Sequence, residues 1–162
     1  MAAKKKESEF NEKLFLKDIN ENFMFESPEK DEDGGIITPK YKTDIFYLDL
    51  LLNGGFPQGR VIGFGAEPGV GKTTALIQAC GNIVERYDKK VYYLDVEGGA
   101  TYELFEAMGY AELLYHPKDN PKGKFYLLSI ETIQDISRVI KQVALDPDTA
   151  VVVIDSDTMV VD

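Results

Sequence analysis

Residues 60–74 read Arg-Val-Ile-Gly-Phe-Gly-Ala-Glu-Pro-Gly-Val-Gly-Lys-Thr-Thr, and this stretch decides the fold. It contains the pattern [Ala/Gly]-x4-Gly-Lys-[Ser/Thr], with Ala66 at the first position, where glycine is usual. A β-branched strand pattern precedes the loop and an apolar helical stretch follows it, which is the context that a phosphate-binding loop (P-loop) requires. The alternative is an ordinary glycine-rich turn, but such a match arises by chance in roughly one per cent of chains of this length. The sequence therefore predicts a nucleoside triphosphate site.

The residue types of the loop match the chemistry of a bound triphosphate. Glycines at 69 and 71 let the backbone curl so that its N–H groups surround the β- and γ-phosphates, at the N-terminus of the following helix. Lys72 is predicted to reach the terminal phosphates, and the Thr73 hydroxyl to coordinate Mg²⁺. Thr74 is a weaker candidate, with a packing or capping role as the alternative. The predicted nucleotide-binding residues of the loop are Ala66, Glu67, Pro68, Gly69, Val70, Gly71, Lys72, Thr73 and Thr74.

A second segment, residues 150–156, is a continuous apolar run that ends in Asp155. Such a run is typical of a parallel strand covered on both faces, and it resembles a Walker B strand. At the carboxyl end of that strand, Asp155 would face the phosphates and hold a Mg²⁺-bound water. The alternative is a solvated aspartate that begins a loop.

A third segment, residues 90–99, is another predicted strand that ends in acidic residues and two glycines. Glu97 is the candidate for orienting the water that attacks the γ-phosphate. Its alternative role is a helix N-terminal charge near Thr101. Asp95 lies two residues earlier, on the same face of the strand but deeper, and is predicted to be structural.

Together these segments resemble RecA/RadA-type recombinases over about residues 40–157, with bacteriophage RecA-like proteins as the expected nearest relatives. KaiC-like and replicative-helicase-like proteins share the same core. Before the P-loop, the resemblance is carried by Leu48-Asp49, Gly54-Gly55, Pro57 and Gly59-Arg60.

The resemblance implies an α/β P-loop NTPase fold, a RecA-like parallel sheet flanked by helices and preceded by an N-terminal helix. It implies ATP and Mg²⁺ as cofactors, with Gly71, Lys72 and Thr73 as phosphate and Mg²⁺ contacts. It makes Glu97 the catalytic carboxylate and Asp155 the Walker B acid. Tyr102 is the candidate for stacking on the adenine, although its register differs from that of bacterial RecA proteins.

The resemblance also implies that the DNA-binding loops and several strands follow the Walker B strand, whereas this sequence ends at Asp162. In this class a later strand inserts between the P-loop and Walker B strands, and its absence leaves unpaired ladder groups. Residues 36–162 are therefore expected to form a partial core that binds ATP without efficient hydrolysis. DNA-dependent ATPase activity is expected of the complete protein.

Residues 1–35 form a separate segment in this interpretation. Apolar residues at helical spacing over 8–25 predict an amphipathic helix, which would grip a neighbouring subunit or pack on its own core. An acidic linker follows over 26–35.

The composition is 44% hydrophobic with one cysteine, and no apolar run approaches the length of about 18 residues that spans a membrane. We therefore expect a cytoplasmic protein, in the cell or in an infected host, without a membrane partner. A net charge of −10 works against indiscriminate nucleic-acid binding. Cys80 is predicted to be a core residue and His116 a structural one.

Further helices are expected over 72–87, 101–109 and 131–145, and a strand over 124–130. The predicted function is that of a RecA-like recombinase, which forms ATP-dependent filaments on single-stranded DNA through residues absent from this chain. A ring ATPase of KaiC or helicase type is one alternative. A truncated, non-catalytic partner of a full-length recombinase is the other.

Overall fold

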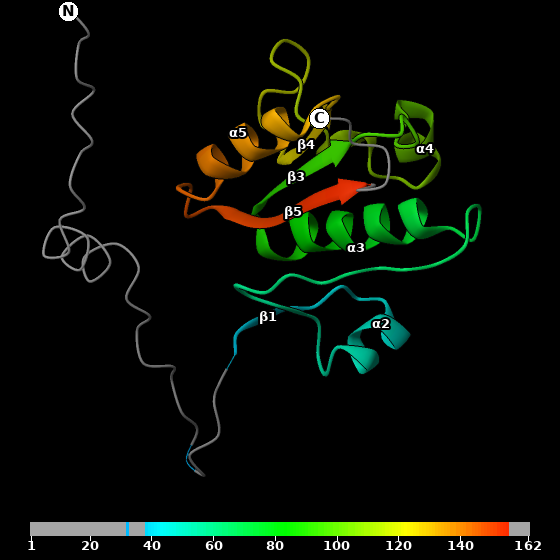
Figure 1. Ribbon diagram of the computed structural model, residues 1–162, viewed down its shortest axis with the longest axis vertical. Helices are drawn as coiled ribbons and strands as arrows, with labels where there is room; N and C mark the ends of the chain where they lie inside the picture. Colours follow the sequence, from blue (N-terminus) through cyan, green and yellow to red (C-terminus); the bar gives the residue numbers. More distant parts are fainter. Residues whose placement is uncertain (1–31, 33–37, 156–162) are drawn as a thin grey trace, which may run out of the picture. The chain divides into compact units, whose positions relative to one another are not determined.

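The computed structural model describes Glu32 and residues 38–155 (Figure 1). The predicted N-terminal helix over 8–25 lies outside the described residues. None of the helices between residues 38 and 155 combines the length and the apolar composition that crossing a bilayer demands. The elements in chain order are β1 (Lys40–Tyr41), α2 (Phe46–Leu51), β2 (Phe56–Pro57), α3 (Lys72–Tyr87), β3 (Lys90–Asp95), α4 (Tyr102–Ala107), the 3-10 helix η1 (Ala111–Leu113), β4 (Phe125–Ser129), α5 (Ile133–Val143) and β5 (Thr149–Asp155).

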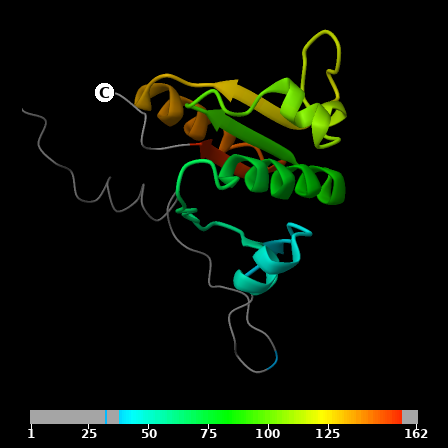
Figure 2. The ribbon, with the colours of Figure 1, turned by 90° about the vertical axis from the view of Figure 1, so that its right-hand side faces the viewer.

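The main sheet has three parallel strands in the order β4-β3-β5. Helix α3 lies along one face of this sheet and α5 lies on the other (Figures 1 and 2). Side chains of a strand alternate between the two faces, so Val91 and Tyr93 join the α3 core while Leu94 packs with Ile136 of α5. This α/β arrangement, with the sheet covered on both faces, confirms the predicted fold class.

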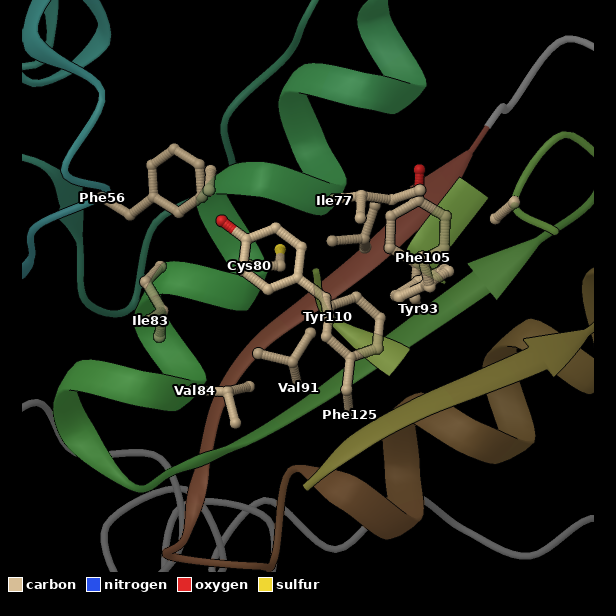
Figure 3. Close-up of a cluster of buried hydrophobic side chains, with 13 residues drawn as sticks. Phe56, Ile77, Cys80, Ile83, Val84, Val91, Tyr93, Phe105, Tyr110 and Phe125 are labelled. Atoms are coloured by element: carbon tan, nitrogen blue, oxygen red, sulfur yellow. The ribbon is translucent and has the colours of Figure 1, made fainter. Parts of the chain in front are cut away.

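Helix α3 follows from the apolar spacing of its sequence. Its buried positions Ile77, Cys80, Ile83 and Val84 recur on one face, and Figure 3 shows them directed towards side chains of the sheet. The backbone of the helix also packs closely: a Cβ placed on Gly81 would lie 2.8 Å from ring atoms of Tyr110. Only glycine therefore fits this approach without a shift of the tyrosine ring.

Helices α4 and α5 begin at threonine caps. The Thr101 hydroxyl accepts from the Leu104 N–H at 3.3 Å, and the Thr132 hydroxyl accepts from the Asp135 N–H at 3.1 Å. Each cap satisfies one of the unpaired N–H groups at a helix start. The helices and the strand predicted after residue 100 are confirmed, with somewhat shorter bounds.

The segment before the P-loop is anchored by a buried threonine. Thr43 is fully buried, and its N–H and hydroxyl both donate to Asp49 Oδ1, at 2.8 and 2.7 Å. The Thr43 carbonyl accepts from Asn82 Nδ2 of α3 at 2.7 Å, and Asn82 Oδ1 accepts from the Tyr110 hydroxyl at 2.6 Å. Asp49 of the Leu-Asp pattern is thus a structural acceptor.

The strand predicted immediately before the P-loop is absent, and this part of the prediction is wrong. Residues 60–66 form no strand, and Val61 is fully exposed. A strand needs a hydrogen-bonding partner, and the described sheet ends at β5, with no strand placed between β5 and this segment. The local β-branched pattern does not supply that partner.

Candidate nucleotide-binding site

The P-loop is an exposed turn, and Lys72 of the loop donates hydrogen bonds to backbone carbonyls at the start of the same loop. Gly69 and Gly71 have φ angles of 77° and 93°, in the left-handed region that glycine adopts without strain. Lys72 Nζ donates to the carbonyl oxygens of Ala66 and Glu67, at 3.1 and 3.2 Å. The ammonium group therefore lies over the loop, where an anion could replace the carbonyls as its partner.

The N-terminus of α3 meets the same loop. Its N-cap residue, Gly71, offers no side-chain cap, and the first turn contains no acidic residue. The first N–H groups of the helix and its dipole therefore favour an anion at this position. Thr74 lies in this turn with an exposed side chain, so the predicted packing role is not seen and the cap residue is Gly71.

Two predicted metal-site residues, 82 positions apart, are in direct contact. The Thr73 hydroxyl donates to Asp155 Oδ2 at 2.7 Å, which joins the start of α3 to the end of β5. Asp155 is 6% exposed. The buried hydroxyl of Tyr93 donates to the same oxygen at 2.6 Å. Burial, and then the hydrogen bond to Asp155, raise the pKa of Tyr93, so the phenol stays protonated as a donor.

Asp95 shapes the turn that follows β3. Its Oδ1 accepts from the N–H groups of Gly98 and Gly99 at 2.9 and 3.2 Å, and its Oδ2 accepts from the Ala100 N–H at 3.0 Å. Asp95 is also the β-ladder partner of Asp155. The predicted structural role of this carboxylate is thus supported by three backbone contacts.

Glu97 lies in the turn that Asp95 organises, and its side chain is exposed. The turn approaches the P-loop helix, since a Cβ on Gly99 would lie 3.8 Å from Thr73 Oγ1. The acid in the first turn of α4 is Glu103, whose pKa is lowered by a backbone hydrogen bond. Glu97 thus lies outside α4, in the turn whose Gly99 approaches Thr73.

Tyr102 is the first residue of α4 and is 57% exposed. It lines a cavity of about 590 Å³ together with Tyr115 and His116, and no P-loop residue lines this cavity. His116 Nδ1 lies 2.7 Å from a carboxylate oxygen of Asp119 and 3.1 Å from the backbone nitrogen of the same residue. Adenine stacking by Tyr102 stays a prediction.

The oxygen donors of the site suit Mg²⁺. Thr73 offers a hydroxyl and Asp155 a carboxylate, and Mg²⁺ binds proteins through one or two such oxygens plus waters and substrate phosphates. Within residues 38–155 and Glu32, no cluster of three or more His, Cys, Asp or Glu could hold a metal by itself. The donor set thus fits a metal that arrives with a phosphate ligand.

Tyr93 is the site residue that the sequence reasoning missed. It sits two residues before Asp95, and so on the same face of β3. That spacing, in a strand predicted to end at the phosphate site, is the signal that could have identified it.

The sequence has curated relatives among DNA repair proteins. It is 37% identical over 65 residues to the DNA repair protein RadA of Campylobacter jejuni. The aligned region covers 40% of this chain and 15% of that protein. It is 32% identical over 118 residues to the DNA repair and recombination protein RadB of Thermococcus gammatolerans. Here the aligned region covers 72% of this chain and 51% of that protein. The chain thus spans about half, or less, of the length of these relatives. No protein-family model matches the sequence.

A solved structure shows the same fold. The crystal structure of the RadB recombinase aligns with a TM-score of 0.54 at 31% identity, over 75% of this chain and 53% of that one. This similarity agrees with the P-loop sequence, with strands β3 and β5 that each end in an aspartate, and with the parallel sheet that has helices on both faces. The chain is therefore a homologue of the RadA and RadB recombinases, and it shares its α/β fold with RadB over about half of the length of that chain.

Proposed function

We propose that this chain binds ATP with Mg²⁺ and that the complete protein acts as a RecA-type recombinase in DNA repair. The observation that carries the proposal is the 2.7 Å hydrogen bond between Thr73 and Asp155. It joins the P-loop helix to the predicted Walker B strand, and these are the two elements between which a Mg²⁺-bound triphosphate would lie.

The phosphate contacts follow from the geometry of the loop. Lys72 would exchange the carbonyls of Ala66 and Glu67 for phosphate oxygens, because an ammonium group interacts more strongly with an anion than with a neutral carbonyl. The positive-φ glycines would let the loop N–H groups point at the same anion. Lys72→Ala should then remove the charge while leaving the buried core unchanged.

Bound Mg²⁺ would neutralise phosphate charge, and this chain's residues would hold it there. The Thr73 hydroxyl would offer it a lone pair, and Asp155 would accept a hydrogen bond from one of its waters. Glu97 would orient the water that attacks the γ-phosphate, with Asp95 fixing the turn from which Glu97 projects.

DNA and subunit contacts are proposed from the relatives. The relatives are a DNA repair protein and a DNA repair and recombination protein, which supports DNA as the substrate of the complete protein. We also propose that the complete protein forms filaments on single-stranded DNA and that residues 1–35 contact a neighbouring subunit. A core over 36–162 and a bacteriophage origin belong to the same proposal. A location in the cytoplasm is part of the same hypothesis.

One structural observation favours a second candidate. Residues 60–66 form no strand and are largely exposed, so the P-loop lacks the support of a strand. A site held in this way favours ATP binding over fast hydrolysis, which suits a non-catalytic partner of a full-length recombinase.

The test is steady-state ATP hydrolysis by the 162-residue chain and by the native protein from its source, each with and without single-stranded DNA. The recombinase proposal predicts DNA-stimulated hydrolysis by the native protein and filaments in electron micrographs. Rings in the micrographs would favour the KaiC- or helicase-like alternative. ATP binding with no hydrolysis under any condition would favour the non-catalytic partner.

A further inference from the structure

The ring of Tyr93 lies in a part of the core that consists of apolar side chains. The ring is fully buried between the sheet and α3, beside Phe105 and Phe125 (Figure 3). Its centroid lies 6.0 Å from that of Phe125, in a stacked arrangement. These packing contacts fix the ring, so the direction of the hydroxyl is fixed as well.

That hydroxyl converges with Thr73 on one carboxylate oxygen. Asp155 Oδ2 accepts from Tyr93 at 2.6 Å and from Thr73 at 2.7 Å. The two donors come from different elements, β3 and α3, and they approach a carboxylate that is 6% exposed. A buried carboxylate requires such donors, because burial without hydrogen bonds is costly.

The two donors differ in what they would do when a metal ion is bound. The Thr73 hydroxyl would turn a lone pair towards the metal, which changes its geometry relative to Asp155. Tyr93 is locked by its ring packing and would keep its bond to Oδ2. It would then hold the carboxylate in the orientation that faces the start of α3.

We infer that Tyr93 is a positioning residue for the Mg²⁺ site, acting through Asp155 to set the affinity for Mg²⁺-bound nucleotide. This inference rests on the proposed function. Loss of a hydrogen bond that orients a metal-site residue lowers metal affinity by roughly tenfold or more. Binding of nucleotide without Mg²⁺ depends on the P-loop and should not change.

The experiment compares the full chain with Tyr93→Phe, which removes only the hydroxyl. Dissociation constants for a fluorescent ATP analogue are measured in Mg²⁺ and in EDTA, and thermal denaturation checks folding. Tyr92→Phe is the matched control, since its ring lies on the other face of β3 and stacks on Tyr126 at 4.7 Å.

We expect Mg²⁺ to strengthen binding roughly tenfold less in Tyr93→Phe than in the unchanged chain, with equal affinities in EDTA and no effect of Tyr92→Phe. In an Asp155→Asn background, Tyr93→Phe should have no further effect on the Mg²⁺ dependence. Equal Mg²⁺ dependence of Tyr93→Phe and the unchanged chain overturns the inference alone, as does a parallel loss in Mg²⁺ and in EDTA. An unchanged chain that binds no ATP under either condition overturns the proposed function and this inference with it.

Discussion

Replacing Asp49 by alanine should lower the free energy of unfolding by more than the replacement of an exposed side chain does. Asp49 Oδ1 accepts from the N–H and the hydroxyl of Thr43, and Oδ2 accepts from the Asp44 N–H at 3.1 Å. Thr43 is fully buried, so the alanine variant leaves its two donors without an acceptor in the protein. Asp44 is exposed, and water can replace its bond.

The magnitude follows from those two buried donors. Each unsatisfied buried donor costs about 1–3 kcal/mol, so Asp49→Ala, which leaves two of them, should lower the free energy of unfolding by about 2–6 kcal/mol. Asp49→Asn keeps one acceptor oxygen and should lose about 1 kcal/mol. For a small domain stabilised by about 5–15 kcal/mol, the alanine variant would be strongly affected.

The assay is urea unfolding followed by far-ultraviolet circular dichroism, because the chain has no tryptophan. Asp119→Ala is the control, since its side chain is 84% exposed and an exposed pair with His116 contributes about 1 kcal/mol at most. A loss below about 0.5 kcal/mol for Asp49→Ala, or equal losses for the alanine and asparagine variants, would refute the reasoning.

Three further predictions test other parts of the structure. Gly81→Ala should lower the melting temperature by a few degrees. The added methyl group would lie 2.8 Å from the Tyr110 ring, and such overpacking costs about 1–3 kcal/mol, whereas the helix preference of alanine over glycine returns about 1 kcal/mol. An unchanged or higher melting temperature contradicts this prediction. Asp95→Asn should slow any ATP turnover while leaving the affinity for MgATP unchanged. In a Glu97→Gln background it should cause no further loss of turnover. A loss of affinity that matches the loss of turnover would show that Asp95 acts on nucleotide binding instead. Burial raises the pKa of Cys80 from 9.0 to about 12, so the thiol ionises first in the unfolded chain and the free energy of unfolding should fall as the pH rises from 9.0 towards 12. Denaturation at several alkaline pH values should show a smaller decline for Cys80→Ala, and equal declines would contradict the assignment.

The elements that sequence predicted well are those whose signal is local. The apolar face of α3 repeats within its own 16 residues, and β3 and β5 are apolar runs that end in acids. The starts of α4 and α5 shifted by one or two residues from the predictions because Thr101 and Thr132 serve as caps outside the helices.

The features that sequence did not predict depend on distant partners. Residues 60–66 have a strand-like composition, but a strand forms only beside another strand. Tyr93 and Asp155 are 62 residues apart, and Thr43 and Asn82 are 39 apart. The spacing of Tyr93 and Asp95 indicates a shared face of β3, but the contact of Tyr93 with Asp155 depends on the pairing of β3 with β5. The contact of Asn82 with Thr43 depends in the same way on the packing of α3 against a distant segment.

Equilibrium binding of MgATP to the unchanged chain and to Lys72→Ala tests the central claim, that residues 66–73 form a nucleotide site. Lys89→Ala is the control, because this lysine pairs with Asp148 and lies outside the loop. The account predicts saturable binding by the unchanged chain and the control, and a loss of roughly a hundredfold or more in affinity for Lys72→Ala. Equal affinity of Lys72→Ala and the unchanged chain, or no binding by the unchanged chain, would contradict it.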